Sequence, residues 1–89
     1  MALFQFGSFV ATPAALAHCE KHKVNPLLLL GRHIHGDWGE LASDDVHANQ
    51  NALAYGDRIF SSYRVGDGKV WVITEADRSC TCLMLPEDY

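Results

Sequence analysis

The segment from Lys69 to Glu75 constrains the fold more than any other part of the chain. In an extended backbone its side chains alternate between two sides, with Val70, Val72 and Thr74 on one and Trp71 and Ile73 on the other. A strand that is apolar on both sides is typical of a central strand covered by helices. The segment therefore predicts the middle strand of a sheet that packs against helices.

Two further strands are expected beside this segment. One runs from Arg58 to Arg64 and the other from Ser79 to Leu85, where Pro86 ends it. The turns between the strands are Gly66–Gly68 and Ala76–Arg78. Because short turns join neighbouring strands in antiparallel order, the three strands are expected to form a meander.

Three helix starts precede the strands. They are Thr12-Pro13, Asn25-Pro26 and Ser43 followed by Asp44 and Asp45. The expected helices run from Pro13 to about His22, from Leu27 to His33 or His35, and from Ser43 to Tyr55, with Gly36 and Gly56 as the stops of the last two. The expected buried faces hold Leu27, Leu28, Leu30 and Ile34 in the second helix, and Val46, Asn49, Gln50 and Leu53 in the third.

The fold class that follows is α+β in one domain of residues 1–89. Three N-terminal helices are expected to pack on a three-stranded antiparallel β-meander. The apolar arm from Leu3 to Val10 is either a short edge strand or a packed extended segment.

Composition narrows the function classes. The chain has 7 Lys and Arg against 11 Asp and Glu, a net charge of −4, so direct nucleic-acid binding is not expected. An odd number of cysteines, without a basic leader, favours a reducing cytoplasm. The longest aliphatic run, Leu27–Leu30, is too short to span a membrane. A homodimer would bury more surface, and the sequence neither predicts nor excludes one.

The first helix carries residues that could bind a metal. His18 and His22 are four residues apart and share a helix face, and Cys80 and Cys82 are two further ligands of the right kind. However, the two cysteines are expected to point together into the core, and no Cys-x-x-Cys spacing exists. The sequence alone therefore predicts no metal and no cofactor.

The segment from His33 to Gly39 is the first candidate for chemistry or binding. His33 and His35 lie near a helix end, with Asp37 close behind, which fits either a general base oriented by a carboxylate or a capping histidine beside a loop aspartate. Trp38 is either a plug for the core or an anchor for a partner. The tight turn with Glu75, Asp77 and Arg78 is the second candidate, as a contact for a partner or a phosphate.

Several motifs of the chain resemble one family. They are Thr12-Pro13-x-Ala15-Leu16, Arg32-His33, Gly36-Asp37-Trp38-Gly39-x-Leu41, Asn49-x-x-Ala52-Leu53, Ser61 or Ser62 with Tyr63, Trp71 to Ser79, and Leu85-Pro86-Glu87-x-Tyr89. This pattern, over residues 9–89, is similar to that of small plasmid- and phage-associated bacterial proteins, often labelled plasmid-related proteins or restriction-modification subunits. The resemblance implies a mobile-element setting in the bacterial cytoplasm but no settled activity. In that family Val or Thr commonly stands where this chain has Cys80 and Cys82.

Two functions follow as hypotheses. The first is a small acidic accessory protein that binds a protein partner and inhibits a host defence complex, in the manner of anti-restriction and anti-CRISPR proteins. Its expected partner-binding residues are Asp37, Trp38, Glu75 and Asp77. The second is a metal-independent, toxin-like ribonuclease, with His33 as the acid or base, Arg58 and Arg78 on the phosphate, and Thr81 orienting it. The first hypothesis, without enzymatic activity, is preferred.

Overall fold

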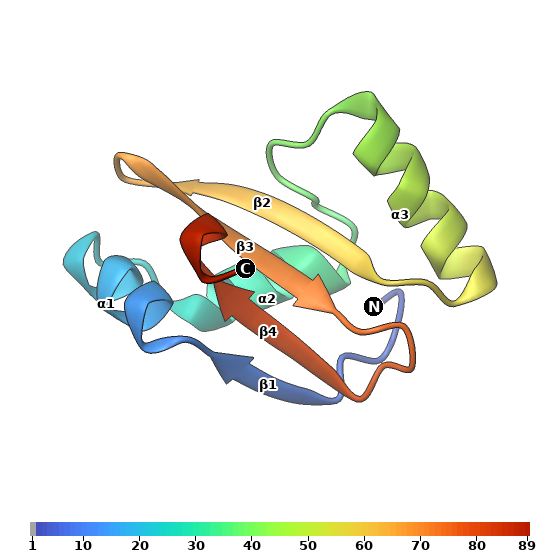
Figure 1. Cartoon of the computed structure of the whole chain (residues 1–89), viewed down its shortest axis with the longest axis horizontal. Coiled ribbons are helices and arrows are strands. Elements are labelled where there is room, and N and C mark those ends of the chain that lie inside the picture. Colours follow the sequence, from blue (N-terminus) through green and yellow to red (C-terminus); the bar gives the residue numbers. More distant parts are fainter. Residues whose placement is uncertain (1) are drawn as a thin grey trace.

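The computed structural model describes residues 2–89 and has an α+β fold (Figure 1). Its elements, in chain order, are β1 (Ser8–Ala11), α1 (Pro13–Lys21), α2 (Pro26–Ile34), α3 (Ser43–Tyr55), β2 (Ile59–Val65), β3 (Gly68–Thr74), β4 (Cys80–Met84) and the 3₁₀ helix η1 (Pro86–Asp88). The three predicted helices and three predicted strands are all present, each within two residues of its expected bounds.

The sheet differs from the predicted meander. It has four strands in the order β1-β4-β3-β2, and β1 runs parallel to β4, with Ser8 opposite Cys80 and Ala11 opposite Leu83. The helices therefore lie between strands and are not all N-terminal. The arm contributes a true edge strand at Ser8–Ala11, and its earlier part has no regular secondary structure. Such a pairing was not predictable because β1 has only four residues and its partner lies about seventy positions away along the chain.

Local signals at the helix ends act as expected in most places. The Thr12 hydroxyl accepts a hydrogen bond from the Ala15 N–H at 3.1 Å, and the side chain of Asn25 accepts one from the Leu27 N–H at 2.9 Å. The third helix begins differently, because Ser43 is its first residue and Ala42 occupies the cap without a side-chain hydrogen bond. Among residues 2–89, no helix is long and apolar enough to cross a membrane.

The predicted buried faces of two helices were right only in part, since Leu30 and Asn49 are buried as expected but most of the other predicted residues are not. In α2, Leu27 and Leu28 are each 62% exposed, while Leu29, Leu30 and His33 are buried. A run of four leucines is apolar in every direction, so its sequence does not show which side faces the sheet. In α3 the buried residues are Asn49 and Ala52.

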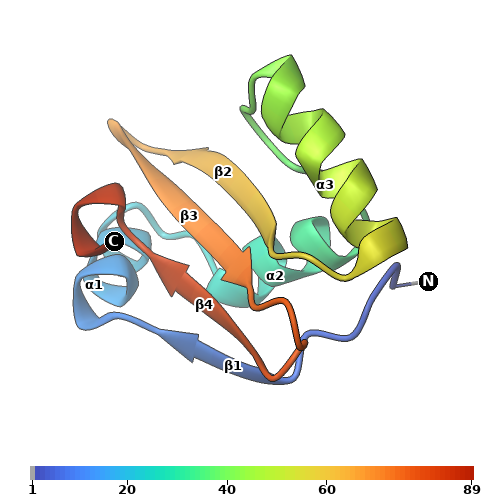
Figure 2. The ribbon, with the colours of Figure 1, turned by 45° about the vertical axis from the view of Figure 1, so that its right-hand side comes forward.

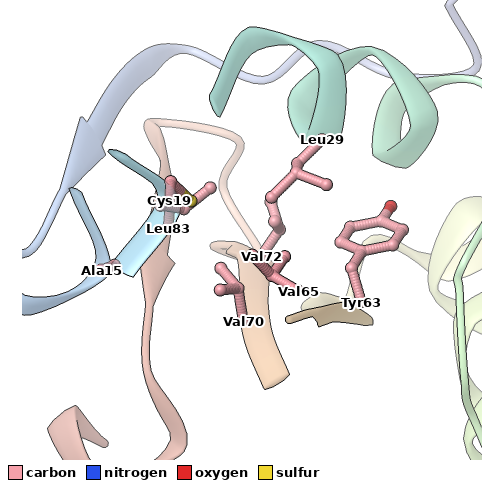
Figure 3. Packing of buried hydrophobic residues seen from close by; sticks show 8 residues of the cluster. All are labelled: Ala15, Cys19, Leu29, Tyr63, Val65, Val70, Val72 and Leu83. Atoms are coloured by element: carbon pink, nitrogen blue, oxygen red, sulfur yellow. The ribbon is translucent and has the colours of Figure 1, made fainter. Parts of the chain in front are cut away.

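The core lies between the sheet and the two helices α1 and α2, which pack on the same face of it (Figures 1 and 2). We call this the inward face. Figure 3 shows its centre, a cluster of Ala15 and Cys19 from α1, Leu29 from α2, and Tyr63, Val65, Val70, Val72 and Leu83 from the strands. Because neighbouring strand residues point to opposite sides, the inward face takes every second residue of each strand.

The opposite side of the sheet, which we call the open face, has no helix layer. It carries the alternate strand residues, namely Phe60, Ser62 and Arg64 of β2, Lys69, Trp71 and Ile73 of β3, and Cys80, Cys82 and Met84 of β4. In Figure 1 only η1 lies in front of this face. The prediction that β3 is covered by helices therefore holds for one face alone. The prediction that Cys80 and Cys82 point into the core was also wrong, because both are partly exposed on the open face.

The outer edge of β2 is protected by side chains and by a loop. The Asn49 amide donates to the Phe60 carbonyl at 2.6 Å and accepts from the Phe60 N–H at 3.0 Å. The loop after α2 pairs with the next main-chain groups of this edge. The Ser62 N–H donates to the Trp38 carbonyl, and the Glu40 N–H donates to the Ser62 carbonyl. Because exposed strand edges invite pairing with other chains, this cover leaves little of β2 free for such pairing.

Candidate functional site

The open face contains a hollow of about 250 Å³ lined by Arg58, Phe60, Trp71, Ile73 and Tyr89. Its aromatic rings pack edge to face, with centroids 5.0 Å apart for Phe60 and Trp71 and 5.9 Å apart for Trp71 and Tyr89. This geometry is the one that aromatic pairs prefer. The hollow is therefore a formed, largely apolar surface feature, although it lies on the solvent side of the sheet.

Arg58 forms the polar rim of the hollow. Its guanidinium donates to the Tyr89 hydroxyl at 3.1 Å, lies 5.7 Å from the centre of the same ring, and pairs with Glu75 at 3.3 Å. These contacts hold Tyr89 beside Trp71. The site therefore offers a ligand an aromatic wall and, at one side, a carboxylate and a guanidinium that already neutralise each other.

Two of the residues predicted to bind a partner lie in the loop after α2, away from the hollow. The Asp37 carboxylate accepts two hydrogen bonds from Arg32, at 2.7 and 3.3 Å, and the first of these contacts lowers the pKa of Asp37 below its ordinary value. Trp38 is partly buried, with its ring 5.9 Å from His33 and 6.5 Å from Phe4. Trp38 thus packs against the side of the core, which is one of the two roles that the sequence left open.

The other two predicted residues lie in the turn between β3 and β4. Glu75 borders the hollow through its pair with Arg58. Asp77 is exposed, and its carboxylate accepts a hydrogen bond from the Ser79 N–H at 2.9 Å, so it shapes the turn. The four predicted residues therefore do not form one surface, and only Glu75 borders the hollow.

His33 is fully buried and forms the centre of a polar network on the inward face. Its Nδ1 lies 2.5 Å from the Ser61 hydroxyl and its Nε2 lies 2.9 Å from the Thr74 hydroxyl. Thr74 contacts Thr81 at 2.7 Å, and Thr81 donates to the Phe6 carbonyl at 2.8 Å. The network therefore ties α2, three strands and the N-terminal arm together.

The last bond of this network fixes the direction of all the others. The Phe6 carbonyl can only accept, so Thr81 donates to it and accepts from Thr74, which in turn accepts from Nε2–H of His33. Nδ1 is then the acceptor for the Ser61 hydroxyl. Burial lowers the pKa of His33 from 6.5 to about 4, so the ring is neutral near pH 7 and carries its proton on Nε2.

The four residues of the ribonuclease hypothesis are not gathered around an accessible site. His33 has no exposed surface and Thr81 is buried in the same network. Arg78 directs its guanidinium to main-chain carbonyls, including those of Asp57 at 2.6 Å and Ala52 at 3.1 Å. Arg58 lines the hollow on the open face. General acid–base catalysis requires contact with the substrate, and the buried position of His33 does not permit it.

The proposed partnership between His33, His35 and Asp37 is also not formed. The carboxylate of Asp37 pairs with Arg32, and the exposed His35 directs Nδ1 to the Gly31 carbonyl at 2.7 Å. This second contact is the capping arrangement that the sequence left open for a histidine at a helix end.

A cation site completed by Cys80 and Cys82 is not formed either. His18 lies on α1 and His22 is its C-cap, on the inward side of the sheet, whereas the two cysteines lie on the open face. The side chain that approaches the histidines is Asp67, from the turn between β2 and β3. Sequence reasoning treated Asp67 as a turn residue only.

The hollow itself was missed by sequence reasoning, although one signal was available. Phe60, Trp71 and Ile73 share a side of their strands, while Ser61, Thr74 and Thr81 share the other. Polar residues at adjacent inward positions require a buried polar partner, and His33 was the available candidate. That argument would have placed the three apolar residues on the opposite side, away from the α1–α2 layer.

Comparison of the chain with protein-family models, with curated proteins and with solved structures finds no match. The resemblance to plasmid- and phage-associated proteins therefore stays an expectation. The case for a function rests on the geometry of the open face.

Proposed function

We propose that this protein acts by binding another protein through the open face of its sheet. The observation that carries the proposal is the aromatic hollow formed by Phe60, Trp71 and Tyr89 on a face that no α-helix of residues 2–89 covers. Aromatic residues and arginine are the side chains that dominate the energetics of protein interfaces. The hollow accepts an aliphatic or aromatic side chain of the partner, and Arg58 contributes a donor at its rim.

The charges around the hollow favour a protein over a nucleic acid. The basic side chain that lines the hollow and the two that lie on the same face are all paired, Arg58 with Glu75 and both Arg64 and Lys69 with the one carboxylate of Glu40. Nucleic-acid binding draws its affinity from unpaired basic groups that replace counterions on phosphates. With a net charge of −4, the chain suits a neutral or basic protein surface instead.

The resemblance noted in the sequence supplies the biological setting of the proposal. In a mobile element, a small acidic protein with one apolar binding face suits an inhibitor of a host defence complex. This part of the proposal rests on association with a family, because fold and setting do not fix function. Its partner would be a subunit of a restriction or CRISPR complex in the bacterial cytoplasm.

The test is affinity capture from bacterial lysate containing restriction and CRISPR systems, followed by reconstitution with the purified partner. Trp71→Ala removes the largest wall of the hollow, and Tyr55→Ala is the matched control, because Tyr55 is an aromatic residue 81% exposed on α3. We expect a stoichiometric partner with the unchanged protein and with Tyr55→Ala, and at least about a tenfold loss of affinity with Trp71→Ala.

Circular dichroism and thermal unfolding establish that the Trp71→Ala protein is folded before its affinity is compared. A partner that binds the folded Trp71→Ala protein as tightly as the unchanged protein would overturn the assignment of the open face. If the reconstituted complex leaves the activity of the defence enzyme unchanged, the inhibitor role is overturned, whereas the assignment of the open face as the binding surface still stands.

A further inference from the structure

We propose that His18, His22 and Asp67 form a binding site for a divalent transition-metal ion of the zinc type. One potential ligand atom from each of the three lies within 4.8 Å of the others. His18 comes from α1, His22 is the C-cap of the same helix, and the aspartate comes from the turn between β2 and β3. The site joins two elements that are far apart in sequence, and it is separate from the open face.

The end of α1 holds the two imidazoles side by side. His18 and His22 are one helical turn apart, and their ring centroids are 4.6 Å apart. The helix ends at His22, after which Lys23 has a φ of +58° and the Val24 N–H bonds back to the Cys19 carbonyl at 2.9 Å. These bonds close the last turn in the way of a helix C-cap, so the backbone at His22 has a defined position.

The turn between β2 and β3 is shaped to receive the His22 ring. Gly66 has a φ of +60°, and any Cβ at this position would overlap the ring atoms of His22. Glycine at the first position of a two-residue hairpin turn provides that conformation without a side chain. The absence of a side chain at Gly66 allows His22 to lie directly against the turn, next to Asp67.

Hydrogen bonding leaves His18 with a free nitrogen for a metal. Its Nε2 lies 2.7 Å from the Val65 carbonyl, and because a carbonyl can only accept, Nε2 carries the proton. The lone pair of His18 is then on Nδ1. A metal-bound histidine commonly donates its other N–H to a carbonyl or carboxylate in this way, which fixes its tautomer and orientation.

The side chain of His22 provides a second, independent observation in favour of a metal site. Its Nε2 is buried and has no hydrogen-bond partner among the described residues, although Oδ1 of Asp67 lies 3.4 Å away. The two atoms are near each other without the alignment of a hydrogen bond. Ligand atoms that converge on a shared ion show this relation, because in a tetrahedral zinc site with bonds of about 2.0–2.2 Å they are about 3.4 Å apart.

The donor set indicates the class of metal. Two neutral imidazoles and one carboxylate suit zinc and similar ions, whereas calcium and magnesium prefer oxygen ligands alone. The Asp67 side chain is 82% exposed, so water takes the fourth position. We assign the bound ion a stabilising role, because it would link α1 to the β2–β3 hairpin. This inference does not depend on the proposed binding partner.

The experiment uses the whole chain, freed of metal with a chelator and titrated with zinc chloride by calorimetry. One equivalent of zinc is expected to bind and to raise the thermal unfolding midpoint. Asp67→Asn, an exposed turn substitution, and His22→Gln are each expected to weaken binding by more than about tenfold. His47→Gln, which changes an exposed histidine on α3, is the matched control and is expected to bind like the unchanged protein.

A double variant, Cys80→Ser with Cys82→Ser, tests the competing thiol site. Retained zinc binding in this variant supports the assignment, and loss of binding overturns it in favour of the thiols. The assignment also fails if the metal-free protein binds no zinc, or if folded Asp67→Asn and His22→Gln proteins bind zinc as tightly as His47→Gln does.

Discussion

The two faces of the sheet differ most where a polar cluster on one lies behind an aromatic cluster on the other. Beside its apolar core, the inward face buries Ser61, Thr74 and Thr81 together with His33, whereas on the open face Phe60 and Trp71 are partly exposed and line the hollow. These four side chains are all hydrogen-bonded within their network, so their burial is tolerated. The difference teaches that the inward face specifies how the elements fit together, while the open face leaves an apolar surface partly exposed, which is the surface that we propose for partner binding.

The largest expected effect is the loss of the buried ring. His33→Ala removes a fully buried side chain and leaves the hydroxyls of Ser61 and Thr74 without their partner, so we expect a loss of about 3–5 kcal/mol in the free energy of unfolding. Urea denaturation monitored by tryptophan fluorescence measures it. His35→Ala, on the same helix end but exposed, is the control and should cost less than about 0.5 kcal/mol. Equal losses in the two variants would contradict the importance of the network.

The next effect is a dependence of stability on acid. The pKa of His33 is about 4 in the folded protein against 6.5 ordinarily, so the unfolded chain binds a proton more readily below pH 6.5. The stability contributed by the neutral ring is therefore complete above pH 6.5 and is lost as the pH falls to 4. At about 1.4 kcal/mol per pH unit this contribution is roughly 3 kcal/mol.

Three carboxylates affect the stability of the fold at lower pH than His33 does. The pKa values of Asp37, Asp77 and Asp88 are lowered from 3.8, so their contributions are present above that pH and are lost below it. Urea denaturation at several pH values should thus show a decline between pH 6.5 and 4 that is flattened in His33→Gln. A decline of the same size in that variant would assign the proton uptake to another group.

The smallest expected effect is a difference in the free energy of unfolding between substitutions at two neighbouring residues of β4. Thr81→Val removes the hydroxyl that links Thr74 to the Phe6 carbonyl and should cost about 1–2 kcal/mol. Cys82→Val changes the adjacent residue on the open face and should alter the free energy of unfolding by less than about 0.5 kcal/mol. Thermal unfolding of both variants measures the contrast. Similar values would show that the two faces do not differ in their tolerance of substitution.

What the sequence predicted correctly was encoded locally. Thr12-Pro13 and Asn25-Pro26 start helices through their own side chains, and Gly56 ends α3 with a φ of +81°. The three predicted strands follow from the alternation of side chains along each short segment and from the turn residues between the segments. These features do not depend on what the rest of the chain does.

The features that were not predicted depend on distant partners. The pairing of β1 with β4, the rotation of α2 that buries Leu29 instead of Leu28, and the one-sided helix layer are all decided by the assembled sheet. For the candidate site, Glu75 was expected and borders the hollow, while Trp71 was read only as part of a buried strand. No local pattern distinguishes a strand covered on both faces from one whose second face is kept for a partner.

The parallel pairing of β1 with β4 has a consequence for synthesis of the protein. Ser8–Ala11 is made about seventy residues before its partner Cys80–Met84, and the bond from Thr12 to Asp88 spans 76 positions. Contacts between such distant segments are slow to form. The nascent chain therefore carries β1 unpaired until β4 has been made, and the sheet closes only after Met84 has emerged from the exit tunnel.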